Sequence, residues 1–266
     1  ALVVAMVICG INDFLAGIFL TIYNAKQKKL NQMPEAVGSF AGKMVILASL
    51  LGGPIANGAY LLGIALAGAA AIPISALNVI FGTIFARIFL KQKLSKRVGL
   101  GMMGCVIGAM IINFSGQIQS KSFLLGVFCA LIAAICWGLE GMISSFGGSV
   151  LDSDIAVNIR ELVSGATIII ILLPLLGGGK LFFSTVVAVS PMFFLVLSGF
   201  SAAVSYLLWY KANASIGCAM GMSLNVTYAL WGVLLSVLFL GTSLTLGMMV
   251  GCVLIVIGAM IVSAES

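Results

Sequence analysis

Long apolar segments alternate with short polar connectors along most of this chain. Nine segments are close to the roughly 20 residues that an α-helix needs to cross a bilayer. They lie near residues 3–23, 43–67, 70–90, 98–114, 123–146, 155–176, 190–210, 219–240 and 244–263. These runs lack the polar and apolar alternation of a barrel strand, so they are predicted to be helices. We therefore predict an all-α, polytopic membrane protein with nine transmembrane helices.

The composition supports a lipid environment. Hydrophobic residues make up 62% of the 266 positions and charged residues only 8%, which exceeds what a water-soluble core requires. The formal net charge is +6, but most cations lie in the connectors and form no basic face, so we expect no nucleic-acid partner. The predicted location is a cell membrane, crossed many times, and the predicted surroundings are a lipid bilayer.

An internal repeat divides the chain. The segment 76–79 (ALNV) resembles 223–226 (SLNV), 108–111 and 258–261 are both GAMI, and 13–17 (DFLAG) aligns with 161–165 (ELVSG). The predicted repeats are residues 1–118, with four helices, and 119–266, with five. The helix near 123–146 has no counterpart in the first repeat, so the first copy is expected to lack its opening helix.

The charges of the connectors indicate that the two repeats are inverted. Copies of five helices enter a membrane in opposite orientations. The connector with Lys91, Lys93, Lys96 and Arg97 is basic, whereas its counterpart at 241–244 carries no charge. Positive charges stay on the cytoplasmic side, so the C-terminus is expected in the cytoplasm and residue 1 outside.

Several short segments follow one another in a recognisable order in both halves of the chain. They are Cys136-Trp137-Gly138, 205–212 (SYLLWYKA), 224–228 (LNVTY) running to Leu240-Gly241, Gly53-Pro54, 60–63 (YLLG) and 90–95 (LKQKLS). In their order and repetition they resemble the EamA-like drug/metabolite transporter family. The resemblance implies two inverted five-helix repeats and solute transport by alternating access around a central cavity, often export of amino acids or related metabolites.

Charged side chains inside the predicted spans are the first candidates for a site. Asp13, Glu140, Arg160 and Glu161 lie there, and each such charge costs about 2.5–3.5 kcal/mol to insert at a helix centre. Asp13 and Glu161 occupy matching repeat positions and are candidates for binding substrate or protons. Two alternatives stay open, namely that Arg160 pairs with Glu140 merely to hold helices together, or that these groups snorkel towards water.

Matched asparagines and aromatic residues extend the candidate site. Asn78 and Asn225 open the fourth helix of each repeat and could bind a zwitterion or join helices. Aromatic side chains could line a cavity, although each could instead anchor a helix at the membrane interface. The predicted substrate-binding residues are Asp13, Tyr60, Asn78, Trp137, Glu140, Arg160, Glu161, Tyr206, Trp209, Asn225 and Tyr228.

Catalysis is not expected. The chain has no histidine, no P-loop motif and no Cys-x-x-Cys pair among its six cysteines, so we predict no catalytic residues, no metal site and no cofactor. The leading hypothesis is a secondary transporter of a small polar or zwitterionic solute. The alternative is a non-transporting membrane subunit or receptor that binds a lipid or protein partner. Gly104-xxx-Gly108 and Gly247-xxx-Gly251 are predicted to pack helices within the chain or between protomers, which allows a homodimer.

Overall fold

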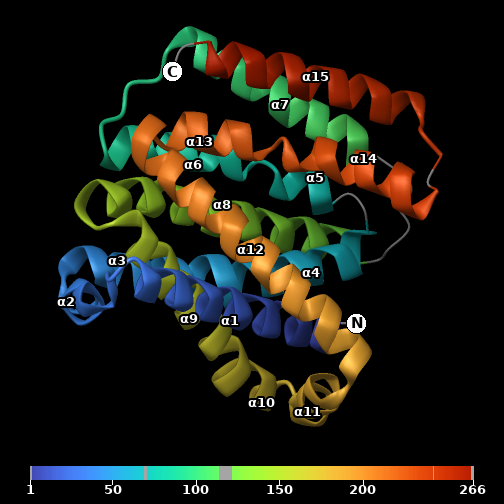
Figure 1. The fold of residues 1–266 in the computed structure, drawn as a ribbon. Coiled ribbons are helices and arrows are strands. Elements are labelled where there is room, and N and C mark those ends of the chain that lie inside the picture. The colour runs from blue at the N-terminus through green and yellow to red at the C-terminus, as the bar shows by residue number, and fades with distance from the viewer. Residues whose placement is uncertain (1, 69–70, 114–121, 242, 265–266) are drawn as a thin grey trace. The chain divides into compact units, whose positions relative to one another are not determined.

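The computed structural model describes residues 2–68, 71–113, 122–241 and 243–264 (Figure 1), and within these ranges every regular element is helical. The α-helices are α1 (Leu2–Lys26), α2 (Met33–Gly38), α3 (Phe40–Leu50), α4 (Ala56–Ala67), α5 (Ala71–Ser75), α6 (Asn78–Phe89), α7 (Lys96–Asn113), α8 (Phe123–Val150), α9 (Ser153–Thr167), α10 (Leu173–Leu175), α11 (Gly179–Val187), α12 (Val189–Ile216), α13 (Cys218–Asn225), α14 (Tyr228–Leu240) and α15 (Leu246–Ser263). The predicted all-α class is confirmed.

Seven continuous helical stretches in the described ranges are long and apolar enough to cross a membrane. They are Leu2–Lys26, Phe40–Ala67, Phe123–Gly147, Ser153–Leu175, Val189–Ile216, Cys218–Phe239 and Leu246–Ser263. Two of the nine predicted spans, 70–90 and 98–114, are not among these seven stretches. The structure has α5 and α6 in the first of them and α7 in the second. The membrane class of the prediction therefore stands, whereas the count of nine spans and the inverted layout remain predictions.

The chain forms two compact units, and each draws on both ends of the sequence. Unit 1 contains Ala1–Leu61 and Ile143–Ser215, and unit 2 contains Leu62–Met142 and Ile216–Ser266. Each unit thus combines helices from both of the predicted repeats. The division at residue 118 itself stays a prediction.

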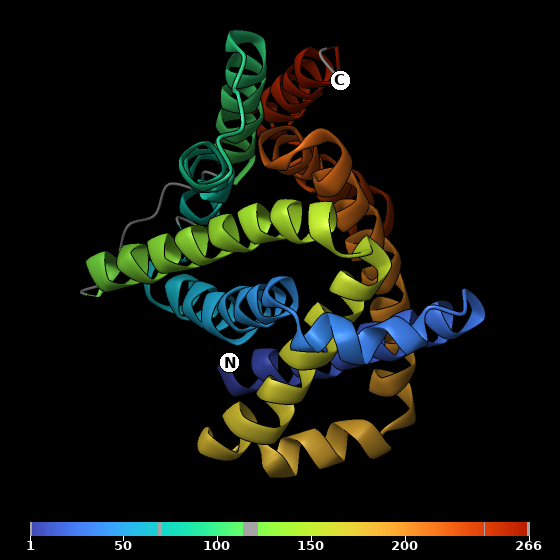
Figure 2. The same cartoon turned by 90° about the vertical axis from the view of Figure 1, so that its left-hand side faces the viewer.

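Helices α1 and α9 cross in unit 1 at two glycines (Figure 2). A Cβ atom added to Gly17 would lie 2.9 Å from the backbone nitrogen of Leu162, and one added to Gly165 would lie 2.6 Å from the Cα atom of Phe14. Both distances are too short for a real contact. Glycine is therefore required for the two backbones to meet, as at other close helix crossings in membranes.

Two of the long helices of unit 1 contain a turn of π-helix beside a proline. Residues Leu51–Ile55 form one between α3 and α4 and include Pro54, while Ile168–Leu172 form the other, just before Pro174. Proline removes a backbone donor and pushes on the preceding turn, and a π turn accommodates that disturbance. In both stretches the proline and the π turn therefore occur together.

In unit 2, α7 and α15 lie side by side along most of their lengths (Figure 1). A Cβ atom on Gly108 would lie 2.6 Å from the carbonyl oxygen of Gly251, and one on Gly101 would lie 2.6 Å from that of Gly258. The glycine faces predicted from the sequence therefore pack against each other within the chain.

This packing gives a matched test on one helix. We expect Gly108→Ala to lower the free energy of unfolding by about 1–3 kcal/mol, because the new methyl group meets backbone that cannot move aside. Gly99 also lies on α7, but open space surrounds it, so Gly99→Ala should be neutral or stabilise by up to about 1 kcal/mol. Unfolding in mixed detergent micelles measures both, and equal effects of the two substitutions would contradict the proposed backbone contact.

Candidate substrate site

A carboxylate and a hydroxyl meet at the middle of two apolar helices. Asp13 lies one residue from the midpoint of Leu2–Lys26, and Ser164 lies at the midpoint of Ser153–Leu175. The Ser164 hydroxyl donates a hydrogen bond of 2.6 Å to Oδ2 of Asp13. A Cβ atom on Gly53 would collide with the Ser164 hydroxyl, so the π turn of Leu51–Ile55 leaves just enough room for this bond.

Arg160 connects this pair to a second acid and to an aromatic ring. Its Nη1 atom lies 2.9 Å from Oε1 of Glu161 and 3.7 Å from Oδ2 of Asp13. Its guanidinium carbon lies 4.2 Å from the centre of the Tyr206 ring, and Nη2 donates to the Tyr206 hydroxyl at 3.2 Å. A planar cation stacked on a ring and paired with carboxylates is held in one orientation. We call Asp13, Arg160, Glu161, Ser164 and Tyr206 the charge cluster.

The charge cluster holds two carboxylates and one guanidinium out of water. Asp13 is 5% exposed, Arg160 1% and Glu161 is fully buried. A buried charge is tolerated when an opposite charge and hydrogen bonds compensate it, and removing one partner leaves the other at high cost. With a surplus of one acid, the cluster can accept a cationic group or a proton, while its guanidinium can hold an anionic group.

A polar strip continues from the charge cluster along the same faces of α1 and α9. The Asn158 amide donates to the carbonyl oxygen of Gly17 at 2.8 Å and to the Thr21 hydroxyl at 3.0 Å. One turn further on, the Asn24 amide donates to the backbone oxygen of Asp154 at 2.9 Å. The strip therefore links the middle of the two helices to their polar end.

Ion pairs finish the strip at that end of unit 1. Lys29 lies 2.6 Å from carboxylate oxygens of both Asp152 and Asp154, and Lys211 of α12 lies 2.8 Å from Asp154. Burial by itself would lower the pKa of the Lys29 ammonium, but the hydrogen bonds to the two aspartates outweigh it and raise the pKa above its ordinary value. The raised pKa keeps Lys29 charged, and these pairs closed, until strongly alkaline pH.

The structure brings together some of the sequence-predicted residues. Asp13, Arg160, Glu161 and Tyr206 form the charge cluster, and the Trp209 ring packs edge-on against Tyr206 with centroids 5.9 Å apart. Tyr60 belongs to the same unit, on α4, and is half-buried. Its contact with a ligand stays a prediction.

The other predicted site residues belong to unit 2. Glu140 is buried on α8, and Trp137 lies half-buried one turn before it. Asn78 begins α6, whereas Asn225 ends α13 and is exposed, as is Tyr228 at the start of α14. Their part in binding a solute, and the expected pair between Arg160 and Glu140, stay predictions.

Ser164 and the polar strip of Asn158, Thr21 and Asn24 were not among the sequence-predicted site residues. The signal that could have identified them is the periodicity of polar and small residues. Along α1, Asp13, Gly17, Thr21 and Asn24 follow one another at steps of three or four, as neighbours on one helix face do. The same steps separate Asp154, Asn158, Glu161 and Ser164 on α9. Charge alone had directed attention to only two of these eight positions, Asp13 and Glu161.

Comparison with known proteins relates the chain to a known family of membrane proteins. The model of the EamA-like transporter family matches residues 124–264. Protein LicB of Haemophilus influenzae is 28% identical over 70% of this chain, and an uncharacterized transporter of Clostridium kluyveri is 25% identical over 69%. The chain spans 63% and 60% of the lengths of these two relatives.

A solved structure resembles the chain over nearly its whole length. One crystal structure matches 98% of this chain and 87% of its own, with a TM-score of 0.77 and 16% sequence identity. At that identity the likeness shows a common fold.

Breaking the central ion pair tests how the charge cluster is stabilised. We expect Arg160→Met to lower the free energy of unfolding by about 3–5 kcal/mol, because it leaves buried carboxylates without their cation. The double variant Arg160→Met, Glu161→Gln should recover part of that loss. The same substitution at exposed Arg87, Arg87→Met, should change stability by no more than about 0.5 kcal/mol. A small effect of Arg160→Met in detergent-solubilised protein would show that the cluster is not stabilised by this pair.

Proposed function

The chain belongs to the EamA-like transporter family, and from this membership we propose that it is a secondary transporter of a small polar or zwitterionic metabolite. Amino acids are the first class to test. The observation that carries the proposal is the charge cluster at the midpoints of two apolar helices. Ionised groups at such positions are costly, and in membrane proteins they usually serve a transported solute or ion. The name of the Clostridium kluyveri relative, a transporter, agrees with this assignment.

The chemistry of the charge cluster supports a zwitterionic solute. An ammonium group of the solute would be attracted to Asp13 and Glu161, and a carboxylate would be attracted to Arg160, which offers two parallel N–H donors. The Tyr206 ring, which lies over the guanidinium, would pack against a short apolar side chain. Each group of the solute would thus replace part of an interaction already present in the protein.

The helix irregularities support alternating access as the transport mechanism. The π turn at Leu51–Ile55 abuts Ser164 through Gly53, and Ser164 holds Asp13. A change of bend at Pro54 would therefore move the Ser164 hydroxyl relative to the carboxylate. In this proposal, bending at the π turn and the state of the charge cluster change together, which is what coupling between solute and conformation requires.

The competing hypothesis of a lipid- or protein-binding subunit loses its main support. It was motivated by glycine-rich helix faces, and in unit 2 those of α7 and α15 pack against each other.

Flux through reconstituted vesicles tests the proposal. The vesicles are loaded with a mixture of unlabelled zwitterionic amino acids and diluted into a trace of the radiolabelled mixture. We expect uptake of label by counterflow in the unmodified chain. Uptake should fall at least about tenfold in Asp13→Asn and in Glu161→Gln, which corresponds to roughly 1.4 kcal/mol each. Both substitutions remove a charge and nearly preserve the shape of the side chain. The control variant Lys180→Gln removes an exposed charge and should leave flux unchanged.

Two outcomes would contradict parts of the proposal. Equal flux in Asp13→Asn, Glu161→Gln and the unmodified chain would rule out the charge cluster as the site. Absence of counterflow with the amino-acid mixture, followed by absence of any thermal shift with wider metabolite pools, would remove the proposed solute class.

A further inference from the structure

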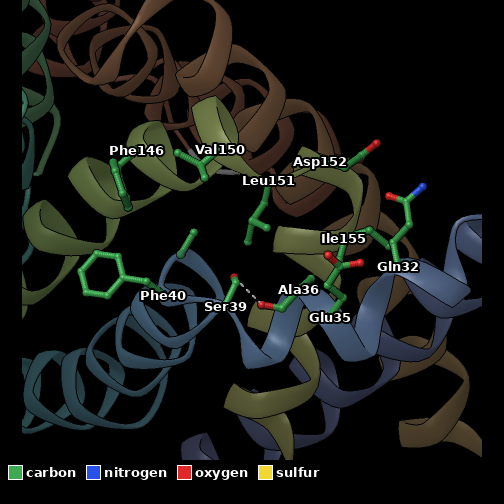
Figure 3. Close-up of a pocket in the computed structure, with 11 residues that line it drawn as sticks. Gln32, Glu35, Ala36, Ser39, Phe40, Phe146, Val150, Leu151, Asp152 and Ile155 are labelled. Carbon is green, nitrogen blue, oxygen red and sulfur yellow. Dashed lines mark hydrogen bonds between the residues drawn. The ribbon is translucent and has the colours of Figure 1, made fainter.

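Unit 1 contains a cavity that none of the sequence-predicted site residues lines. Its volume is about 500 Å³, within the range of pockets for small organic molecules. It lies between the segment from Gln32 to Ala41 and the segment from Phe146 to Ile155 (Figure 3). We call it the Glu35 cavity.

The two ends of the Glu35 cavity differ in character. At one end are Phe40 and Phe146, whose ring centres are 6.4 Å apart in an edge-to-face arrangement. Gln32, Glu35 and Asp152 lie towards the other end (Figure 3). A ligand that fits both ends must have an apolar part and a polar head.

The charge of the lining determines the sign of that head. Both ionisable residues that line the Glu35 cavity are acids, Glu35 and Asp152. Asp152 is engaged, because its Oδ2 pairs with Lys29 at 2.6 Å and its Oδ1 accepts from the backbone N–H of Asp154 at 2.8 Å. Glu35 is exposed and, within the described part of the chain, has no ion-pair partner. The negative charge at this end is therefore not fully compensated, and a cation is favoured.

The position of the Glu35 cavity along the helices also favours an amphipathic ligand. Phe40 begins one span-length helix, Phe40–Ala67, and Asp152 immediately precedes another, Ser153–Leu175. Helix ends of this kind lie where hydrocarbon gives way to water. A ligand there can place its charge in water and its chain against the two phenylalanines, whose faces also attract cations.

We propose that the Glu35 cavity is a binding site for an alkylammonium ion, with the ammonium group between Glu35 and Asp152 and the alkyl chain against Phe40 and Phe146. This site is separate from the charge cluster and does not depend on the proposed transport. The ammonium competes with Lys29 for Asp152. Occupancy would therefore weaken the ion pairs that tie the α1–α2 connector to the start of α9.

Titration calorimetry on the whole chain in lipid nanodiscs tests the site, with three probes of equal chain length. Hexylammonium should give saturable binding, whereas hexan-1-ol and hexanesulfonate, which lack the positive charge, should bind at least about tenfold more weakly. Empty nanodiscs supply the partitioning background. Equal affinities for the three probes, or no saturable heat with hexylammonium, would overturn the proposal.

Substitutions in the Glu35 cavity test where hexylammonium binds and distinguish a loss of binding from a loss of protein structure. Glu35→Gln should weaken hexylammonium binding about tenfold, and Phe146→Leu should weaken it severalfold. Lys29→Gln should strengthen it severalfold because it frees Asp152, and loss of structure could not produce a gain. Phe40→Ala should also weaken hexylammonium binding. Its matched control is Phe183→Ala on α11, because Phe183 is exposed to nearly the same extent as Phe40, 68% against 69%. Phe183→Ala should leave the binding unchanged. Unchanged affinity in Glu35→Gln, or weaker binding in Lys29→Gln, would contradict the assignment.

Discussion

The interaction on which unit 1 depends is the compensation of the Asp13 carboxylate inside two apolar helices. Ser164 donates to it at 2.6 Å, and the Arg160 guanidinium lies 3.7 Å away while pairing with Glu161. These distances require the backbones of α1 and α9 to approach closely, which explains the glycines at 17 and 165. The polar strip then continues the same contact to the ion pairs of Lys29. Removing the central compensation would leave a charge in hydrocarbon, where no solvent can replace it.

Helix association in unit 2 also depends on close contact between backbones. Lipid tails are as apolar as the helix surfaces, so burial of apolar side chains gives little drive for helices to associate. Here α7 and α15 meet through glycine backbones, with a Cβ on Gly108 or Gly101 only 2.6 Å from a carbonyl oxygen of the partner helix. Close backbone contact at glycines is thus common to both units, and in unit 1 the charge cluster lies beside it. The charge cluster belongs to unit 1, whereas Glu140, which is also buried, belongs to unit 2.

The sequence predicted the membrane class and part of the charge cluster, and physical reasons explain both the success and its limit. Asp13, Arg160 and Glu161 stood out because a charge in an apolar run is costly and rare. Ser164 did not, because a serine in a helix is unremarkable until its carboxylate partner is placed 151 positions away. The π turns at Pro54 and before Pro174 also depend on packing, and hydropathy averaged over 20 residues cannot detect them. The Glu35 cavity forms between segments more than a hundred residues apart, so local pattern could not indicate it.

The central claim is that a solute reaches the charge cluster from water, and labelling of a nearby cysteine tests it most directly. Cys9 lies one helical turn before Asp13 on α1 and is half-buried. In a chain whose other five cysteines are replaced by alanine, the rate at which a small water-soluble methanethiosulfonate modifies Cys9 can be measured in mildly alkaline buffer. We expect measurable modification of Cys9 in the folded protein. A solute that the protein transports in reconstituted vesicles should slow this modification severalfold. Modification at the same rate with and without that solute, while flux persists, would contradict it.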